Sequence, residues 1–507
     1  MSKWFLGIDI GTSSCKTLVV DERGAVIGRS SVEYPHSMPQ PQWSEQNPED
    51  WWQGVVRSVP EALAAGGVRG TDVAAVGLTG QMHGLTLLDR DGAVLRPAIL
   101  WNDQRTAAEC EWITKRVGAQ RVLELTGNPV LTGFTAPKLI WVRAHEPEVY
   151  AQIAHWLLPK DYIRYRLSGE FCGDVSDASG TSLFDVGRRC WSEEMMAALD
   201  LPRAWLAEVN ESPVVSARVS AEAARLTGLT AGTPIVAGAG DQAAQAIGTG
   251  IVAEGTVSAT IGTSGVVFAA CNQFRVDTQG RLHAFCHAVP GLWHQMGVML
   301  SAGGSFEWLC GALAPLVTDE SLGGKESGKS ELHGRLLAMA AKAPAGCEGL
   351  TFLPYLTGER TPHADPLARG AFVGLTPRHG LPHLVRAVLE GVSFGLRDSL
   401  ELMKTGGTTV RTVRVSGGGA RSGLWRQILA DVFGCEIVTV NASEGAAYGA
   451  ALLAAVGAGA FANVPATSVV IQEVERTQPG GQQRAYEAAY QRFRSLYPAL
   501  RPWYQAG

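Results

Sequence analysis

The sequence predicts an α/β fold built from two lobes. Apolar runs of strand length alternate with longer amphipathic runs typical of helices, which is the pattern of an α/β protein. A strand–turn–strand unit near the N-terminus recurs halfway along the chain. The 507 residues also exceed the size at which a single core stops growing, about 250–300 residues. We therefore expect one lobe over residues 1–246 and another over residues 247–507, with the boundary in the stretch 244–254.

The bulk composition excludes several classes of protein. Hydrophobic residues make up 46% of the chain and charged residues 18%, which is an ordinary globular balance. The net charge is −5 without a block of Lys or Arg, so neither a nucleic acid nor an anionic membrane is expected as a partner. Nine scattered cysteines form no CxxC pair, which favours a reduced, cytoplasmic protein.

One segment has the length of a membrane span. Residues 445–464 carry no charge, but 13 of these 20 residues are Gly or Ala, so the stretch is weakly hydrophobic. We expect a tightly packed buried helix here. The N-terminal apolar run is too short for a signal peptide.

The first half opens with a strand, a turn and a strand. Residues 4–9 are apolar, residues 11–14 are a Gly-Thr-Ser-Ser turn, and residues 16–21 continue as a second strand. Further elements are expected as strands at residues 25–29, 73–78 and 85–89 and as a helix at residues 52–65.

The second half repeats the opening unit. Residues 256–261 are a β-branched run, residues 262–265 are a Gly-Thr-Ser-Gly turn, and residues 266–269 continue as an apolar run. The repeat predicts two lobes of similar design. Further elements are expected as helices at residues 381–403 and 424–433 and as a strand at residues 413–416.

The first turn has the chemistry of a phosphate site. Backbone N–H groups and the hydroxyls of Thr12 and Ser13 suit phosphate oxygens. Asp9 ends an apolar strand, where a carboxylate is costly unless it is paired, solvated or near a cation such as Mg²⁺. The alternative is that Asp9 only caps the turn.

The Gly-Ala-Gly-Asp run at residues 238–241 delivers a carboxylate at the tip of a turn, before an expected helix. Asp241 is therefore a candidate general base, and the alternative is an N-cap for that helix. The run also matches the G-x-G-x-x-A pattern of dinucleotide-binding folds. That interpretation is disfavoured because an acid inside the loop would repel a pyrophosphate, and the next acid, Glu254, comes earlier than the pattern requires.

Two glycine-rich loops compete as nucleotide sites. Residues 323–330 match G-x-x-x-x-G-K-S, but the preceding residues are polar and indicate no strand, so we expect a surface loop. Residues 417–422 lie between a strand and a helix, where glycines permit close approach of a base or ribose.

Two polar clusters suit a sugar. Residues 81–84 (Gln-Met-His-Gly) follow an expected strand, so that Met82 and His83 are candidates for contact with the carbon face and the hydroxyls. Residues 101–105 place Trp101 among polar side chains with the same capacity. A lone histidine in a loop is more often structural.

Taken together, these segments resemble the FGGY family of carbohydrate kinases, and within it the xylulokinases. The resemblance runs from about residue 4 to residue 460. It rests on segments found in family order: GIDIGTSS (7–14), GQMHG (80–84), WNDQRT (101–106), DVSDASGT (174–181), GAGDQAA (238–244), GTSG (262–265), LPYLTGERTPH (353–363) and SGGGARS (416–422).

The resemblance implies actin-like and hexokinase-like lobes around a central cleft, with the sugar and the catalytic base in the first lobe and the nucleotide in the second. It implies ATP and Mg²⁺ as cofactors, with Asp241 as proton acceptor and Asp9 as the acid near the metal. Met82, His83 and Trp101 would bind the sugar. The implied nucleotide residues are Thr12, Ser13, Thr263 and Ser264 at the phosphates and Gly418, Gly419 and Ala420 at the adenosine.

The expected reaction is phosphorylation of xylulose to its 5-phosphate. The alternatives are a kinase for another polyol (ribulose, gluconate or glycerol), an actin-like ATP switch without a sugar substrate, and a dinucleotide oxidoreductase. Small-molecule sugar and ATP are the expected partners. Residues 482–507 leave a homodimer interface open.

Overall fold

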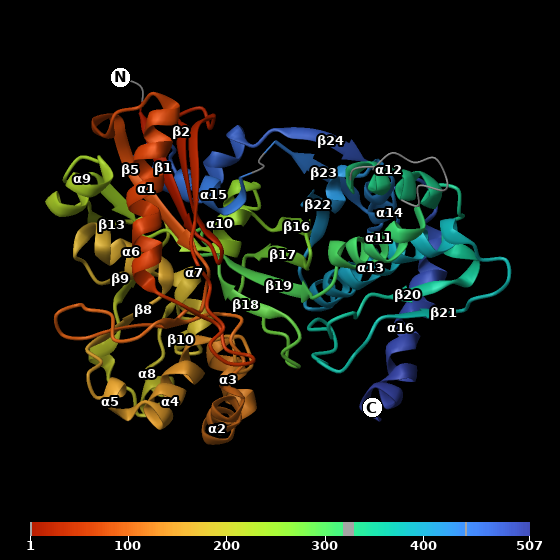
Figure 1. Cartoon of the computed structure of the whole chain (residues 1–507), viewed down its shortest axis with the longest axis horizontal. Helices are drawn as coiled ribbons and strands as arrows, with labels where there is room; N and C mark the ends of the chain where they lie inside the picture. Colours follow the sequence, from red (N-terminus) through yellow and green to blue (C-terminus); the bar gives the residue numbers. More distant parts are fainter. Residues whose placement is uncertain (1–2, 318–328, 442–443, 507) are drawn as a thin grey trace. The chain divides into compact units, whose positions relative to one another are not determined.

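The computed structural model describes residues 3–317, 329–441 and 444–506, and helices and strands alternate along them (Figure 1). The chain divides into two compact units. Unit 1 consists of Met1–Ala253, Ala270–His294 and Ala442–Gln472, and unit 2 of Glu254–Ala269, Gln295–Asn441 and Glu473–Gly507.

This division differs from the two contiguous lobes expected from the sequence. The first boundary lies after Ala253, inside the expected stretch, but residues 442–472 return to unit 1. They return because helix α15 (Gly445–Gly457) packs on strands β1 and β5 of that unit.

Unit 1 is built on a sheet of order β13-β14-β5-β1-β2-β3, to which β15 adds by pairing with β5. β1 is antiparallel to β2 and parallel to β5. The strands are β1 (Trp4–Ile10), β2 (Ser14–Asp21), β3 (Val26–Glu33), β5 (Val73–Gly80), β13 (Val215–Arg218), β14 (Pro234–Val236) and β15 (Ala239–Gly240). The strands predicted at the start of the chain and at residues 73–78 are confirmed.

Helices cover both faces of this sheet. On one face, α1 packs on β2 and β3 and shares a hydrophobic core with alternate residues of β1, including Leu6 and Ile8. On the other face, α10 and α15 pack together, and α15 lies against β1 and β5. The alternation of side chains along a strand produces this two-sided burial.

The remaining elements of unit 1 form a second hydrophobic cluster, which includes residues of α2, α3, α4 and α8. The unit's main helices are α1 (Pro48–Gly66), α2 (Ala107–Val117), α3 (Ala119–Thr126), α4 (Thr135–His145), α6 (Pro159–Ser168), α7 (Val175–Ala178), α8 (Glu193–Leu199), α9 (Ala221–Thr227), α10 (Asp241–Gly248) and α15. Short strand pairs join β4 (Glu45–Gln46) to β7 (Ala98–Ile99), β6 (Thr86–Leu88) to β8 (His155–Leu157), and β9 (Cys172–Asp174) to β12 (Glu208–Asn210).

Unit 2 repeats the β2-β1-β5 arrangement. β16 is antiparallel to β17 across the second Gly-Thr-Ser turn and parallel to β22, in a seven-stranded sheet of order β18-β19-β17-β16-β22-β23-β24, where β18 is His283–Cys286. The strands are β16 (Gly255–Ile261), β17 (Gly265–Cys271), β19 (Trp293–Met299), β22 (Val410–Ser416), β23 (Glu436–Val440) and β24 (Glu473–Thr477). The predicted repeat of the hairpin is therefore confirmed.

The helices of unit 2 include the two predicted from periodicity. They are α11 (Gly303–Val317), α12 (Lys329–Ala340), α13 (Leu381–Thr405), α14 (Gly423–Phe433) and α16 (Gln483–Gln505). The C-terminal segment forms one helix, α16, whose Tyr486, Tyr490 and Phe493 are buried by packing within unit 2. The homodimer stays a prediction.

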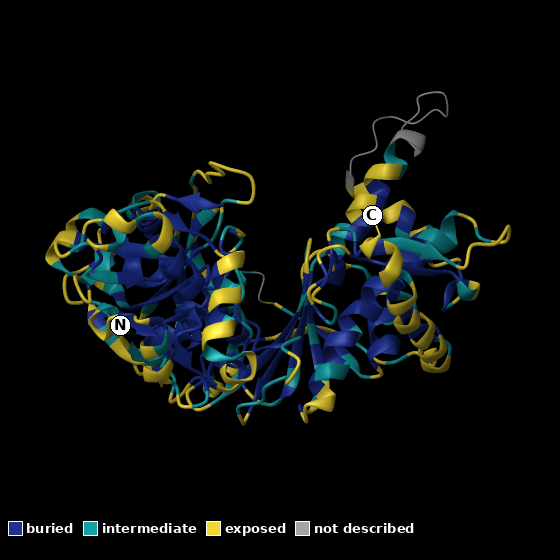
Figure 2. Cartoon of the chain, turned by 90° about the horizontal axis from the view of Figure 1, so that it is seen from below, coloured by how far each residue is buried: buried dark blue, intermediate teal, exposed yellow. Residues whose placement is uncertain are grey.

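Burial follows the layers. Figure 2 shows buried residues concentrated in the strands, and exposed residues along outward faces of the helices. Helix α15 is buried over Ala447–Ala455, which confirms the expected packed helix. In the described ranges no helix is both long and apolar enough to cross a membrane. All nine cysteines are free thiols.

Candidate active site

A polar cavity of about 270 Å³ lies in unit 1 at the end of β1. It contains both carboxylates singled out from the sequence, Asp9 and Asp241, together with Thr12. The full lining is Asp9, Gly11, Thr12, Lys16, Gln81, Asp241, Gln242, Gln245, Glu444, Gly445 and Ala446.

The sheet topology brings these residues together. β1 and β5 run parallel, and in their register Asp9 lies opposite Thr79. β15 is also parallel to β5, so that Gly240, the residue before Asp241, lies opposite Gly80. The carboxyl ends of three parallel strands thus meet at one edge of the sheet, which is where α/β proteins commonly bind ligands.

Asp9 is a half-buried carboxylate in a like-charged environment. Its pKa is raised to about 7, mainly by burial and also by the charge of Asp241, while Lys16 acts in the opposite direction. A cation at this position would favour the ionised form. Asp9 is part of β1 and not the cap of a turn, because the turn is closed by the Gly11 N–H donating to Ser14 O (3.0 Å).

Asp241 is the first residue of α10. The N-cap is Gly240, so the alternative that Asp241 caps this helix is wrong. Its Oδ1 accepts a hydrogen bond from Gln242 N at 2.7 Å. Burial raises the pKa of Asp241 to about 6, and the bond from Gln242 opposes this rise. A carboxylate with this pKa is ionised at neutral pH and still basic enough to accept a proton.

Thr12 links the turn at residues 11–14 to Trp101. The Trp101 Nε1–H donates to Thr12 Oγ1 (3.0 Å), and Thr12 Oγ1 donates to Gln81 Oε1 (3.3 Å). Trp101 nevertheless remains 43% exposed. Ser13 is exposed and does not line the cavity described above; its main-chain oxygen accepts from Tyr34 N (3.3 Å).

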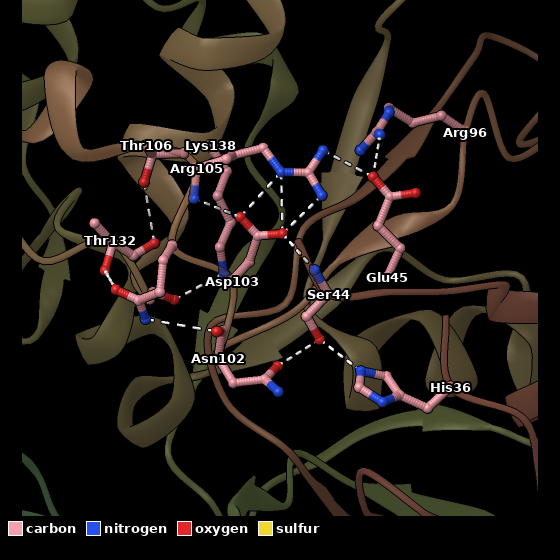
Figure 3. A network of polar contacts seen from close by, with 12 residues as sticks. His36, Ser44, Glu45, Arg96, Asn102, Asp103, Arg105, Thr106, Thr132 and Lys138 are labelled. Carbon is pink, nitrogen blue, oxygen red and sulfur yellow. Dashed lines mark hydrogen bonds and ion pairs between the residues drawn. The ribbon is translucent and has the colours of Figure 1, made fainter. Parts of the chain in front are cut away.

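The rest of the cluster around Trp101 is structural (Figure 3). Asp103 is fully buried and accepts from Ser44 N (2.7 Å) and from Arg105 Nη2 (2.6 Å). Arg105 also pairs with Glu45 (2.8 Å) and lies 3.6 Å above the ring of Trp43. The expectation that this whole polar cluster faces a sugar is therefore corrected for Asp103 and Arg105. Their charged groups pair with each other and with Ser44 and Glu45, and these contacts hold the loop at residues 101–105 in place.

Met82 and His83 lie directly after β5, next to the loop that carries Asp241. A Cβ atom added at Gly240 would lie 2.9 Å from Met82 Cγ, so Met82 packs against the residue before Asp241. His83 has a φ of 69°, which is uncommon for a residue with a side chain and marks a backbone held in place by its surroundings. Its ring stacks on Phe134 with centroids 4.6 Å apart.

The second Gly-Thr-Ser turn lies in unit 2 beside the glycine loop. Thr263 and Ser264 are exposed, and the start of α11 holds the turn through Gly304 N donating to Thr263 O (3.0 Å). Gly417 has a φ of 86°, and a Cβ there would lie 2.5 Å from Ile261 O. The predicted nucleotide residues of this unit are thus close together.

The three candidate adenosine residues of the glycine loop differ in solvent exposure. Gly418 is exposed with open space around its Cα, whereas Gly419 and Ala420 are buried below it. The G-x-x-x-x-G-K-S run falls mostly on residues 318–328, outside the described part of the chain, and Lys329 begins α12.

Sequence reasoning missed Lys16, Gln245 and Glu444, which line the cavity. The position of Lys16 could have been predicted from the sequence, because a hairpin with its turn at residues 11–14 places Lys16 opposite Asp9. Glu444 pairs with Lys16 (3.3 Å) and Arg29 (3.1 Å), and no local pattern connects residues so far apart in the chain.

The site fits a metal bound mainly through phosphates. Among the described residues, no group of three or more His, Cys, Asp or Glu side chains forms a metal cage. Mg²⁺ does not need one, because it is commonly held by one or two carboxylates together with substrate phosphates and water. Asp9 offers one carboxylate at the polar cavity.

Comparisons with known proteins match the whole length of the chain. Residues 4–248 match the N-terminal domain of the FGGY family of carbohydrate kinases, and residues 257–458 match its C-terminal domain. The chain is 42% identical to xylulose kinase of Escherichia coli K12 and 37% identical to that of Bacillus subtilis 168, covering 98% of this chain in both and 99% and 97% of those proteins. The crystal structure of xylulose kinase from Rhodospirillum rubrum superposes with a TM-score of 0.92 at 32% identity, covering 99% of this chain and 100% of that one.

Proposed function

Because the chain belongs to the FGGY family of carbohydrate kinases, we propose that it phosphorylates D-xylulose to D-xylulose 5-phosphate with ATP. The substrate is inferred from the xylulose kinases that the chain resembles over nearly its full length. The observation that carries the proposal is the placement of Met82 against Gly240, which puts the candidate sugar-binding pair beside the candidate base.

Asp241 accepts the proton of the primary hydroxyl of the sugar. As that proton leaves, the hydroxyl oxygen forms a bond to the γ-phosphorus, and the bond between this phosphorus and the β–γ bridging oxygen breaks, so that ADP departs. Phosphoryl transfer requires little covalent help from a protein, and positioning and charge neutralisation supply most of the rate.

The other site residues orient the two substrates. Met82 packs against the carbon face of the sugar, and His83 and Trp101 bind its hydroxyls. Thr12 and Ser13 in unit 1 and Thr263, Ser264 and the Gly418–Ala420 segment in unit 2 bind the nucleotide. Ser13 is proposed here because its exposed hydroxyl follows Thr12 in the same turn.

Asp9 would hold Mg²⁺, the proposed metal, which would supply positive charge at the phosphates. Lys16 lies directly opposite Asp9 in the β1–β2 hairpin and is paired to Glu444. We infer that Lys16 contributes a second positive charge at the phosphates, with Glu444 fixing its position.

A sugar panel tests the proposal. Purified protein is incubated with ATP and Mg²⁺ and with xylulose, ribulose, gluconate or glycerol, and ADP release is measured by a coupled assay. We expect kcat/KM to be highest for xylulose and the background without sugar to be low. A higher kcat/KM for another polyol would reassign the substrate, and rapid ADP release without any sugar would indicate an ATPase switch instead.

A further inference from the structure

We propose that the segment Asp174–Gly180, which contains α7, is a positioning element that sets both Asp241 and His83. This inference rests on the proposed function and deepens it. The segment is buried throughout, and none of its residues takes part in the steps above. Each of its two ends contacts a different part of the site.

At one end, Ser176 holds the residue before the base. Its Oγ accepts a hydrogen bond from Gly240 N (3.1 Å) and donates one to Asp174 Oδ2 (2.5 Å). A hydroxyl has one proton, and the carboxylate of Asp174 occupies it, so the lone pairs of Ser176 are left to accept from Gly240. Because Gly240 is the N-cap of α10, this bond fixes where that helix, and therefore Asp241, begins.

A buried ion pair sets the orientation of Ser176. Lys160 Nζ lies 2.9 Å from Asp174 Oδ1, and both side chains are fully buried. Asp174 Oδ2 also accepts from Ser176 N (2.7 Å). Buried ion pairs contribute little net stability but restrict geometry, which suits a positioning role.

At the other end, Gly180 holds the sugar-binding histidine. His83 Nδ1 lies 2.7 Å from Gly180 O, so Nδ1 carries the proton and donates it. A Cβ atom at Gly180 would lie 2.4 Å from His83 Nδ1 and 3.0 Å from Met82 Cε. The backbone at Gly180 is not in the left-handed region, so an alanine would act through these contacts alone.

The segment therefore fixes the distance between the base and the sugar. Ser176 and Gly180 are four residues apart in one buried turn of chain, and Met82 packs between Gly180 and Gly240. A sugar held by His83 and Met82 is presented to Asp241 at a separation that this turn determines. Sub-ångström placement of this kind has large effects on phosphoryl transfer.

The test compares kcat and KM for Ser176→Ala, Gly180→Ala and the control Thr181→Val. Thr181 is a buried neighbour whose hydroxyl donates to Ala178 O (2.7 Å) and accepts from Leu183 N (3.1 Å), so that its hydrogen bonds involve neither Gly240 nor His83. We expect Ser176→Ala to lower kcat by about 10- to 100-fold with little change in the sugar KM. Gly180→Ala should raise that KM by about tenfold or more with a smaller change in kcat. The control should keep both constants within about twofold of wild type.

Wild-type protein assayed with the sugar panel separates this inference from the proposed substrate. If another sugar is the better substrate, the same three variants are compared with that sugar. Equal losses in all three variants, or an unchanged sugar KM in Gly180→Ala, would overturn the inference. Circular dichroism and melting temperature identify a variant that misfolds. If Ser176→Ala does not fold, the sugar KM of Gly180→Ala tests the inference by itself.

Discussion

At Asp241, burial and catalysis make opposite demands on one carboxylate. Burial raises its pKa to about 6, above the usual value near 3.8, so folding favours the protonated carboxyl group between these two pH values. The proposed proton transfer requires the ionised carboxylate. The folded state therefore binds more protons than the unfolded state between these two pH values, and stability falls as the pH rises through that window.

We expect Asp241→Asn to lose activity and gain stability. The rate should fall by about 10²–10⁴-fold, the usual contribution of a general base, while ATP still binds. At pH 7.5 the free energy of unfolding should rise by about 1–2 kcal/mol, a figure reduced because the carboxylate keeps partial solvent access. Denaturant titrations at pH 7.5 and pH 4 measure this gain, which should be smaller at pH 4. Turnover within tenfold of wild type would contradict the assignment.

The pH profile gives a second prediction at this scale. With nucleotide and metal saturating, the cation proposed at Asp9 would keep Asp9 ionised, so that Asp241 alone must lose a proton. We expect kcat/KM for the sugar to fall below about pH 6 with a limiting slope of one, because only the ionised base is active. Initial rates from pH 5 to 8 measure it. A flat profile down to pH 5 would contradict the role of Asp241.

At the scale of elements, glycines let α15 approach the sheet. A Cβ at Gly7 would lie 2.0 Å from Ala447 O, and a Cβ at Gly77 would lie 1.9 Å from Ala450 O. The backbone of α15 therefore packs directly against the backbone of β1 and β5. The small Gly and Ala side chains of α15 also permit this close approach. The same helix brings Glu444 and Gly445 to the cavity.

We expect Gly7→Ala to destabilise unit 1 because α15 must move away from β1. The cost should be about 1–3 kcal/mol, typical of overpacking. Gly311→Ala is the matched control, since Gly311 is an exposed helical glycine with open space around it. There the exchange should be neutral or stabilising by about 0.5–1 kcal/mol. Urea unfolding monitored by tryptophan fluorescence compares the two variants, and equal stability would show that the contact relaxes at no cost.

At the scale of the whole molecule, the proposed sugar residues belong to unit 1, whereas nucleotide residues are proposed in each unit. Met82 and His83, proposed to bind the sugar, lie in unit 1, and Thr263, Ser264 and Gly418, proposed to bind the nucleotide, lie in unit 2. Since a ligand stabilises the backbone that it contacts, each substrate should protect the segments proposed to bind it from hydrogen exchange.

We expect xylulose alone to slow amide exchange around residues 80–84 and 238–242. A non-hydrolysable ATP analogue alone should slow it around residues 11–14, 262–265 and 417–422. Peptide-resolved hydrogen–deuterium exchange of the full chain measures both effects. Nucleotide protection confined to residues 323–330 would instead assign the nucleotide to the G-x-x-x-x-G-K-S run.

Many of the strands and helices could be predicted from local sequence patterns. The two Gly-Thr-Ser hairpins, the strand at residues 73–78, and the helices at residues 381–403 and 424–433 were all predicted, because hydrophobic period and turn residues are local signals. Asp9 was recognised because a carboxylate at the end of an apolar strand is costly unless it is paired, solvated or near a cation. Asp241 was recognised because a glycine-rich turn delivers its carboxylate at the tip, before an expected helix.

The sequence by itself determined the fold class, the repeated hairpin and the two carboxylates. The tertiary structure alone decided that residues 442–472 return to unit 1, that Asp103 and Arg105 anchor a loop, and that Ser176 holds Gly240. These contacts join residues that are tens to hundreds of positions apart. Periodicity and turn chemistry report only on neighbours in the chain, whereas such contacts are set by how the packed layers bring distant segments together.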